Sequence, residues 1–167
     1  ACGGAESDSE RPPAKIRNTA NLSSQIGTGG AGIDVVNSSG SLTLSGTLLG
    51  AGSLTKSGAG ELVLSGTNTT YSGSTTLSAG LLTFRNAAAL GTGSLVINAG
   101  SLNTLSSGTV LTHNGQQFWN SDITFLGSGA LTLGSGSVRL SADRTLNVVF
   151  STLTVGGSIS GAAALTK

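Results

Sequence analysis

The only histidine of the chain, His113, is its one side chain with an ordinary pKa close to neutral pH. A Ser-His-Asp arrangement would have to use it, with Asp122 or Asp143 as the acidic partner. The Gly-x-Ser-x-Gly turn that exposes the nucleophile of many hydrolases does not occur in the sequence. We therefore expect a solvated histidine in a turn over residues 112–115, and a protein that is not an enzyme.

Carboxylates are the other groups that could act as acids or bases. Beyond the N-terminal segment there are four of them, Asp34, Glu61, Asp122 and Asp143, and no two are close in sequence. Glycosidases need paired carboxylates, and stacked coils of chain can bring distant acids together. Such an enzyme is the alternative to the non-catalytic interpretation, which assigns no catalytic residue.

A glycine-rich stretch fits two ligand-binding patterns. Residues 27–32 (GTGGAG) match the dinucleotide pattern Gly-x-Gly-x-x-Gly, but no helical periodicity follows, and Asp34 comes two residues later instead of about twenty. Residues 29–37 (GGAGIDVVN) match a calcium-binding nonapeptide, but residues 38–46 do not repeat it, and calcium takes six or more oxygen ligands. We expect a turn leading into a strand over residues 33–36, with Asp34 exposed and no cofactor or metal; calcium at Asp34 is the alternative.

Phe118 and Trp119 are adjacent, so on a strand their side chains point to opposite faces. One of them is expected to fill the core. The other is then available at the surface, where an aromatic ring can stack on a sugar or on a protein. The interpretation as a glycan-binding module takes Trp119 as its anchor.

The composition narrows the classes of partner. Charged residues make up 9% of the chain and the formal net charge is +1, which gives no electrostatic basis for binding nucleic acid. The apolar residues come in short runs, so we expect no membrane-spanning segment. Cys2 is the single cysteine, which excludes an intrachain disulfide. It is either an incidental thiol or a lipidated anchor next to a cleaved signal.

The first 20 residues differ from the rest because charged side chains are concentrated there, beside Pro12 and Pro13, in a chain that is otherwise poor in charge. We interpret residues 1–20 as a flexible tail or linker and residues 21–167 as one repeat domain. In that domain short apolar runs, many alternating with Thr or Ser, are separated by Gly, Ser and Asn, which is typical of half-buried strands. The runs are residues 42–44, 62–64, 81–84, 95–97, 123–126, 131–133, 146–150 and 153–155.

The strongest feature is repetition. Residues 42–47 (LTLSGT) recur twenty positions later as residues 62–67 (LVLSGT), and residues 76–80 (TLSAG) recur at the same offset as residues 96–100 (VINAG). This offset fits one coil of a solenoid with about three short strands, which must stack on other coils to be stable. Over a longer distance, residues 42–56 resemble residues 153–167 without a gap, which predicts coils nested in a longer module.

Residues 50–83 (GAGSLTKSGAGELVLSGTNTTYSGSTTLSAGLLT) resemble the autotransporter-associated β-strand repeat, or passenger-associated repeat. The matching residues are Gly50, Gly52, Leu54, Lys56, Gly58, Gly60, Leu64, Asn68, Tyr71, Gly73, Thr75 and Gly80. One extra Thr stands between Asn68 and Tyr71. Residues 114–125 (NGQQFWNSDITF) and 131–134 (LTLG) resemble sequence found between such repeats, so the resemblance covers about residues 40–167.

The resemblance implies an all-β fold, the right-handed parallel β-helix or β-solenoid, in a secreted or cell-surface bacterial protein. There it would be a structural passenger stalk or scaffold without catalysis. Two alternatives stay open. One is a subunit of an extracellular filament that associates end to end with copies of itself through the open ends of the solenoid. The other is an adhesin that contacts a cell surface or a glycan.

Overall fold

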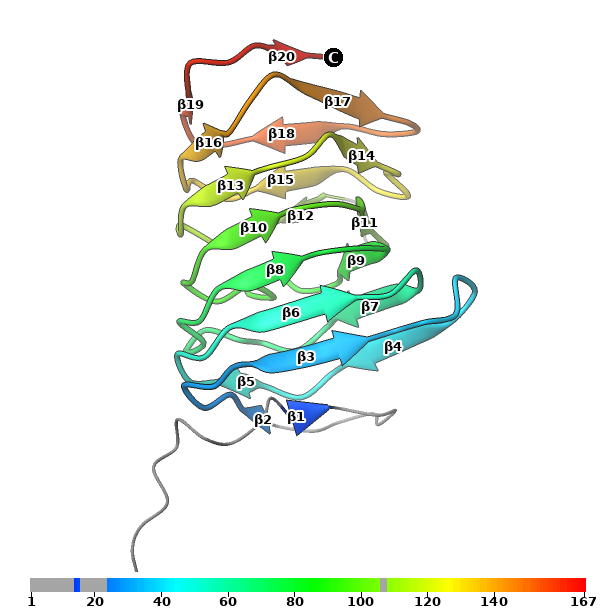
Figure 1. The fold of residues 1–167 in the computed structure, drawn as a ribbon, viewed down its shortest axis with the longest axis vertical. Helices are drawn as coiled ribbons and strands as arrows, with labels where there is room; N and C mark the ends of the chain where they lie inside the picture. The colour runs from blue at the N-terminus through cyan, green and yellow to red at the C-terminus, as the bar shows by residue number, and fades with distance from the viewer. Residues whose placement is uncertain (1–13, 16–23, 106–107) are drawn as a thin grey trace, which may run out of the picture.

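The chain winds into a stack of short parallel strands (Figure 1). The computed structural model describes residues 14–15, 24–105 and 108–167. Every strand pair in these ranges is parallel, and they contain no helix. The described part of the chain therefore has no helix that could cross a membrane. The fold is the all-β parallel solenoid that the sequence predicts.

Eight strands form the first sheet, which is the front layer of Figure 1. In spatial order they are β1 (Ala14–Lys15), β3 (Ala31–Asp34), β6 (Leu54–Ser57), β8 (Thr75–Leu77), β10 (Leu95–Ile97), β13 (Gln117–Trp119), β16 (Val138–Leu140) and β19 (Ile159–Ser160). The strand β1 belongs to the segment interpreted as a tail. The rest of that segment, Cys2 included, lies outside the described residues.

The other two sides of each coil carry the remaining strands. The second sheet consists of β4 (Ser41–Leu44), β7 (Glu61–Leu64), β9 (Leu81–Phe84), β11 (Ser101–Thr104), β14 (Ile123–Phe125), β17 (Arg144–Val148) and β20 (Leu165–Thr166). The third side has β2 (Ser24–Gln25) paired with β5 (Leu48–Leu49), and β12 (Thr109–Val110), β15 (Leu131–Leu133) and β18 (Leu153–Val155). Each of the eight predicted apolar runs falls on a strand, although the runs 123–126 and 146–150 extend one and two residues beyond β14 and β17. The coils that begin at β6 and β8 cross the third side without a strand, so three strands per coil is not a constant of the fold.

The register confirms the repeat of twenty residues. The strand β4 pairs with β7 so that Leu42 lies beside Leu62, and β8 pairs with β10 at the same offset. In the first sheet one coil spans 20 residues between β8 and β10 and 23 residues between β3 and β6. The longer repeat is wrong as a structural equivalence, because residues 42–44 lie in the second sheet and residues 153–155 on the third side. Their likeness reflects the alternation that every side of the solenoid needs.

The core is a continuous apolar column inside the coils. In β15, for example, Leu131 and Leu133 are buried and Thr132 between them points outward. Because the strands are parallel and in register, each inward side chain lies over one from the preceding coil. The buried cluster runs in this way from Ile26 to Leu146.

A column of glycines lines one corner of the solenoid. A Cβ atom at any of these positions would overlap the carbonyl oxygen of a glycine in the preceding coil. The backbones of successive coils are therefore in direct contact at this corner, and only glycine fits. We call this set the glycine column, and each member lies two residues before a strand of the first sheet: Gly52, Gly73, Gly93, Gly115, Gly136 and Gly157.

Candidate functional site

His113 is a core residue. Its side chain is 1% exposed, and its Nε2 atom lies 2.5 Å from the carbonyl oxygen of Gly93. The prediction of a solvated histidine is therefore wrong, because His113 shares the inward strand parity of the buried Leu111. Burial lowers the pKa of His113 below its ordinary value, and the contact with Gly93 opposes part of that shift.

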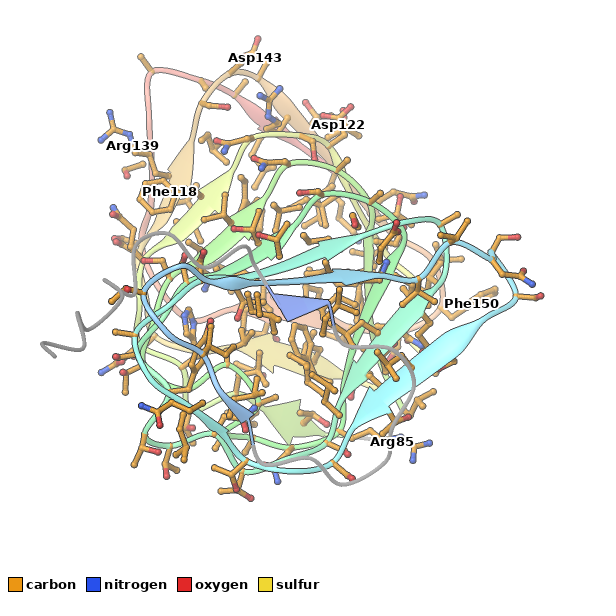
Figure 2. The ribbon with its side chains drawn as sticks, turned by 60° about the horizontal axis from the view of Figure 1, so that its bottom comes forward. Arg85, Phe118, Asp122, Arg139, Asp143 and Phe150 are labelled. Carbon is orange, nitrogen blue, oxygen red and sulfur yellow. The ribbon has the colours of Figure 1, made fainter. Side chains whose placement is uncertain are left out.

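Asp122 and Asp143, the two candidate partners of His113, lie at the corner that leads into the second sheet (Figure 2). Asp122 Oδ1 accepts a hydrogen bond of 2.9 Å from the backbone N–H of Thr145. Asp143 Oδ1 accepts one of 2.8 Å from the backbone N–H of Ala164. Each carboxylate thus ties its own corner to the next coil.

The other two carboxylates lie elsewhere. Glu61 Oε1 accepts a hydrogen bond of 2.6 Å from the Thr83 hydroxyl, and Asp34 is exposed at the end of β3 as expected. Residues 27–30 form the turn before β3, and β3 begins and ends two residues earlier than predicted. Among the described residues no three of His, Cys, Asp and Glu are grouped so that they could hold a metal ion.

The aromatic pair divides between the inside and the outside. Trp119 is fully buried in the core, whereas Phe118 lies half-buried on the outer face of the first sheet. The assignment of Trp119 as an exposed anchor for a glycan is therefore wrong. The ring that is available at the surface is Phe118 (Figure 2).

Lys56 is a functional side chain that sequence reasoning did not place. It points inward from β6 and is fully buried. Its Nζ atom donates to the carbonyl oxygens of Ser57 at 2.6 Å, Gly58 at 2.8 Å and, in the next coil, Ala79 at 3.2 Å. Burial lowers the pKa of Lys56, and the carboxylate of Asp34 in the preceding coil partly opposes this. An ammonium has three N–H donors, and here each has an acceptor.

Asn68 joins three coils. Its side-chain oxygen accepts a hydrogen bond of 2.8 Å from the backbone N–H of Leu48 in the preceding coil. Its side-chain nitrogen donates one of 2.7 Å to the carbonyl oxygen of Ala89 in the following coil. The side chain is 1% exposed, so both bonds are shielded from water.

Tyr71 is buried at the corner of the glycine column. Its hydroxyl oxygen lies 3.0 Å from the carbonyl oxygen of Gly52 and 2.9 Å from that of Ser74. Burial raises the pKa of Tyr71 to about 12. Like Lys56 and Asn68, Tyr71 therefore directs its polar atoms at the backbone of neighbouring residues and coils.

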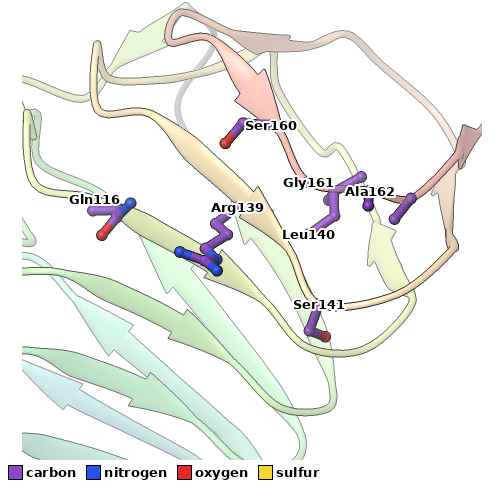
Figure 3. A pocket seen from close by; sticks show the side chains of 8 residues that line it. Gln116, Arg139, Leu140, Ser141, Ser160, Gly161 and Ala162 are labelled. Carbon is purple, nitrogen blue, oxygen red and sulfur yellow. The ribbon is translucent and has the colours of Figure 1, made fainter.

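A pocket of about 560 Å³ opens near the C-terminal end of the first sheet (Figure 3). Residues 161–163 line it together with polar side chains from three successive coils. These polar side chains are Gln116, Arg139, Ser141 and Ser160. Arg139 is the one charged residue among those that line this pocket. The arrangement suits an anionic or strongly polar ligand.

Comparison with known proteins identifies one part of the chain. Residues 54–84 match the family model of the passenger-associated-transport-repeat. No curated protein and no solved structure matches the chain. The matched segment runs from the first residue of β6 to the last residue of β9. The coils that Lys56, Asn68 and Tyr71 fasten to their neighbours thus match the passenger-associated-transport-repeat, the family that the motifs of the sequence indicated.

Proposed function

We propose that the chain is a structural β-solenoid region, a stalk or scaffold, of a secreted or cell-surface bacterial passenger protein, and that it carries no catalytic site. One observation supports this above all. Three buried polar side chains of the matched repeat, Lys56, Asn68 and Tyr71, bind backbone atoms, and each reaches a neighbouring coil. Such contacts make a stack of coils rigid, which is what a stalk requires.

The experiment is to place the chain between an outer-membrane anchor and an epitope in a Gram-negative host, and to measure protease access to the epitope on intact cells. Leu62→Asp puts an unpaired carboxylate into the core, where it costs several kcal/mol, so we expect epitope display to fall sharply. Thr43→Asp, on the exposed outer face of β4, is the matched control and should leave display unchanged. If epitope display were unchanged by Leu62→Asp, the proposal of a structural stalk would be contradicted.

A second candidate is end-to-end self-association. Ile159 of β19 is 44% exposed, although Val138 beside it in the sheet is fully buried. A second copy that added a strand to β19 would cover this side chain. Light scattering during size-exclusion chromatography should then show a mass that rises with concentration, and Ile159→Lys should abolish the rise. A constant monomer mass contradicts this candidate.

A further inference from the structure

The guanidinium of Arg139 has no hydrogen-bond or ion-pair partner among the described residues. The contrast with Arg144, a few positions later, is informative. The Nη2 atom of Arg144 donates to the carbonyl oxygen of Asn120 and to the hydroxyl of Ser141, both at 2.8 Å, and its Nη1 atom also has an acceptor. Arg144 is therefore part of the framework, whereas the guanidinium of Arg139 is free to bind a ligand.

No carboxylate of the described residues neutralises the charge of Arg139. The carboxylates of Asp122 and Asp143 lie at another corner and accept backbone N–H groups there. The residues that line the pocket include no acid. A free guanidinium in a hollow whose other lining residues are uncharged attracts an anion.

The register places an aromatic ring beside this charge. Phe118 pairs with Arg139, and Arg139 pairs with Ser160, so the three side chains form a row on the outer face of the first sheet. Neighbouring strands are about 4.8 Å apart, so the ring of Phe118 and the guanidinium can contact the same small molecule. Figure 2 shows both residues on one side of the solenoid, far from Arg85 and Phe150.

We propose that this row and the adjoining pocket bind a sugar that carries a carboxylate, such as a uronic acid unit of a polysaccharide. Arg139 has parallel N–H donors that match the two oxygens of a carboxylate. Phe118 offers a flat apolar surface to the C–H face of the sugar ring. Gln116 supplies neutral groups for its hydroxyls, and the Ser160 hydroxyl, which donates to the carbonyl oxygen of Val138, can still accept from one of them. The site does not depend on the stalk function, because all these side chains point away from the core.

The test is a titration of the whole chain with sodium glucuronate, followed by nuclear magnetic resonance of the backbone amides. We expect shifts confined to the pocket and a Kd of about 1 mM, typical of a single sugar that contributes about 4 kcal/mol. Glucose, which lacks the carboxylate, and acetate, which lacks the ring, should each bind at least tenfold more weakly. Arg139→Gln and Phe118→Ala should each weaken glucuronate binding about tenfold.

Two control variants make the same kinds of chemical change at positions outside the proposed site. Arg85→Gln removes an exposed arginine outside the pocket, and Phe150→Ala removes a ring that is 83% exposed; both should leave the affinity unchanged. If Arg85→Gln weakens binding as much as Arg139→Gln, the attraction is diffuse and the proposal is wrong. Equal affinity for acetate, or for inorganic phosphate, would also overturn it, since the ring would then play no part. If Phe118→Ala fails to fold, Phe118→Leu serves, because it keeps apolar volume without a flat face.

Discussion

The ammonium of Lys56 lies among three carbonyl oxygens inside the core of the solenoid. A buried charge destabilises a protein unless polar atoms surround it closely. Two of these oxygens belong to the corner that follows β6, and the third belongs to the corresponding corner of the next coil. Lys56 therefore joins two corners that the strand ladders alone would not connect.

We expect Lys56→Met to lower the free energy of unfolding by about 1–3 kcal/mol, because the side chain keeps its length while three oxygens lose a donor. Urea denaturation followed by circular dichroism measures the change. Thr55→Ala, on the outer face of the same strand, should change it by less than about 0.5 kcal/mol. A Lys56→Met chain as stable as the original would mean that dehydration of the ammonium outweighs its hydrogen bonds.

His113 should make stability depend on pH. Burial holds its pKa in the folded chain below the ordinary value of 6.5, so on acidification the unfolded chain takes up the proton first. The contribution of neutral His113 to the free energy of unfolding should be fully present above pH 6.5 and should decrease as the pH falls below it. His113→Gln removes this titration, so its urea midpoint should fall less between neutral and mildly acidic pH. The same dependence in both chains would refute the assignment.

The sequence contains the positions of these buried polar residues but not their partners. Lys56 and His113 have the strand parity of Leu54 and Leu111, and alternation alone places such side chains inside. The ordinary preference of Lys and His for the surface argues the other way. Their acceptors depend on which corner of which coil lies opposite. Which corners lie opposite each other depends on the strand register. A single sequence predicts this register only where the sequence repeats.

At the scale of the element, apolar alternation predicts strands well. The strands β9, β10, β15 and β18 have the bounds of their apolar runs. Among the strands without such a run, β8 and β13 begin with an inward polar residue, Thr75 and Gln117. Their place in the sheet comes from the neighbouring coils, so local pattern could not reveal them.

The glycine column gives a test at this scale. In Gly93→Ala the new Cβ would overlap the carbonyl oxygen of Gly73, and we expect the free energy of unfolding to fall by about 2–4 kcal/mol. Gly32→Ala is the matched control, because a Cβ there meets no atom within 4 Å. It should leave stability unchanged or raise it by up to ~1 kcal/mol, since alanine restricts the unfolded chain. Equal thermal midpoints for the two variants would exclude the steric argument.

At the scale of the whole molecule, each coil contacts mainly the coils before and after it, so coils should be removable as units. Thr75 pairs with Leu54 on one side and with Leu95 on the other. Deletion of residues 75–94 therefore brings Leu95 beside Leu54 in the correct register. We expect a folded rod, shorter by about 4.8 Å, in small-angle scattering.

The control for that deletion removes one residue fewer, residues 75–93. At the new junction β10 and β11 then slip by one position against β6 and β7, which turns their apolar side chains outward. This variant should unfold at a markedly lower temperature than the deletion of residues 75–94. Equal thermal midpoints for the two deletions would show that the stacking of the coils does not depend on strand register.

The glycine column also determines which corners of the solenoid can vary in length. Its distance from the following strand of the first sheet is two residues in six coils, whereas the corners on the other sides differ in length: six residues separate β3 from β4, but three separate β6 from β7. The solenoid has one fixed edge and two adjustable ones. Insertions that create new surface loops should accumulate at the adjustable edges, so a lineage of such chains can vary what it displays while the pitch of the stack stays the same.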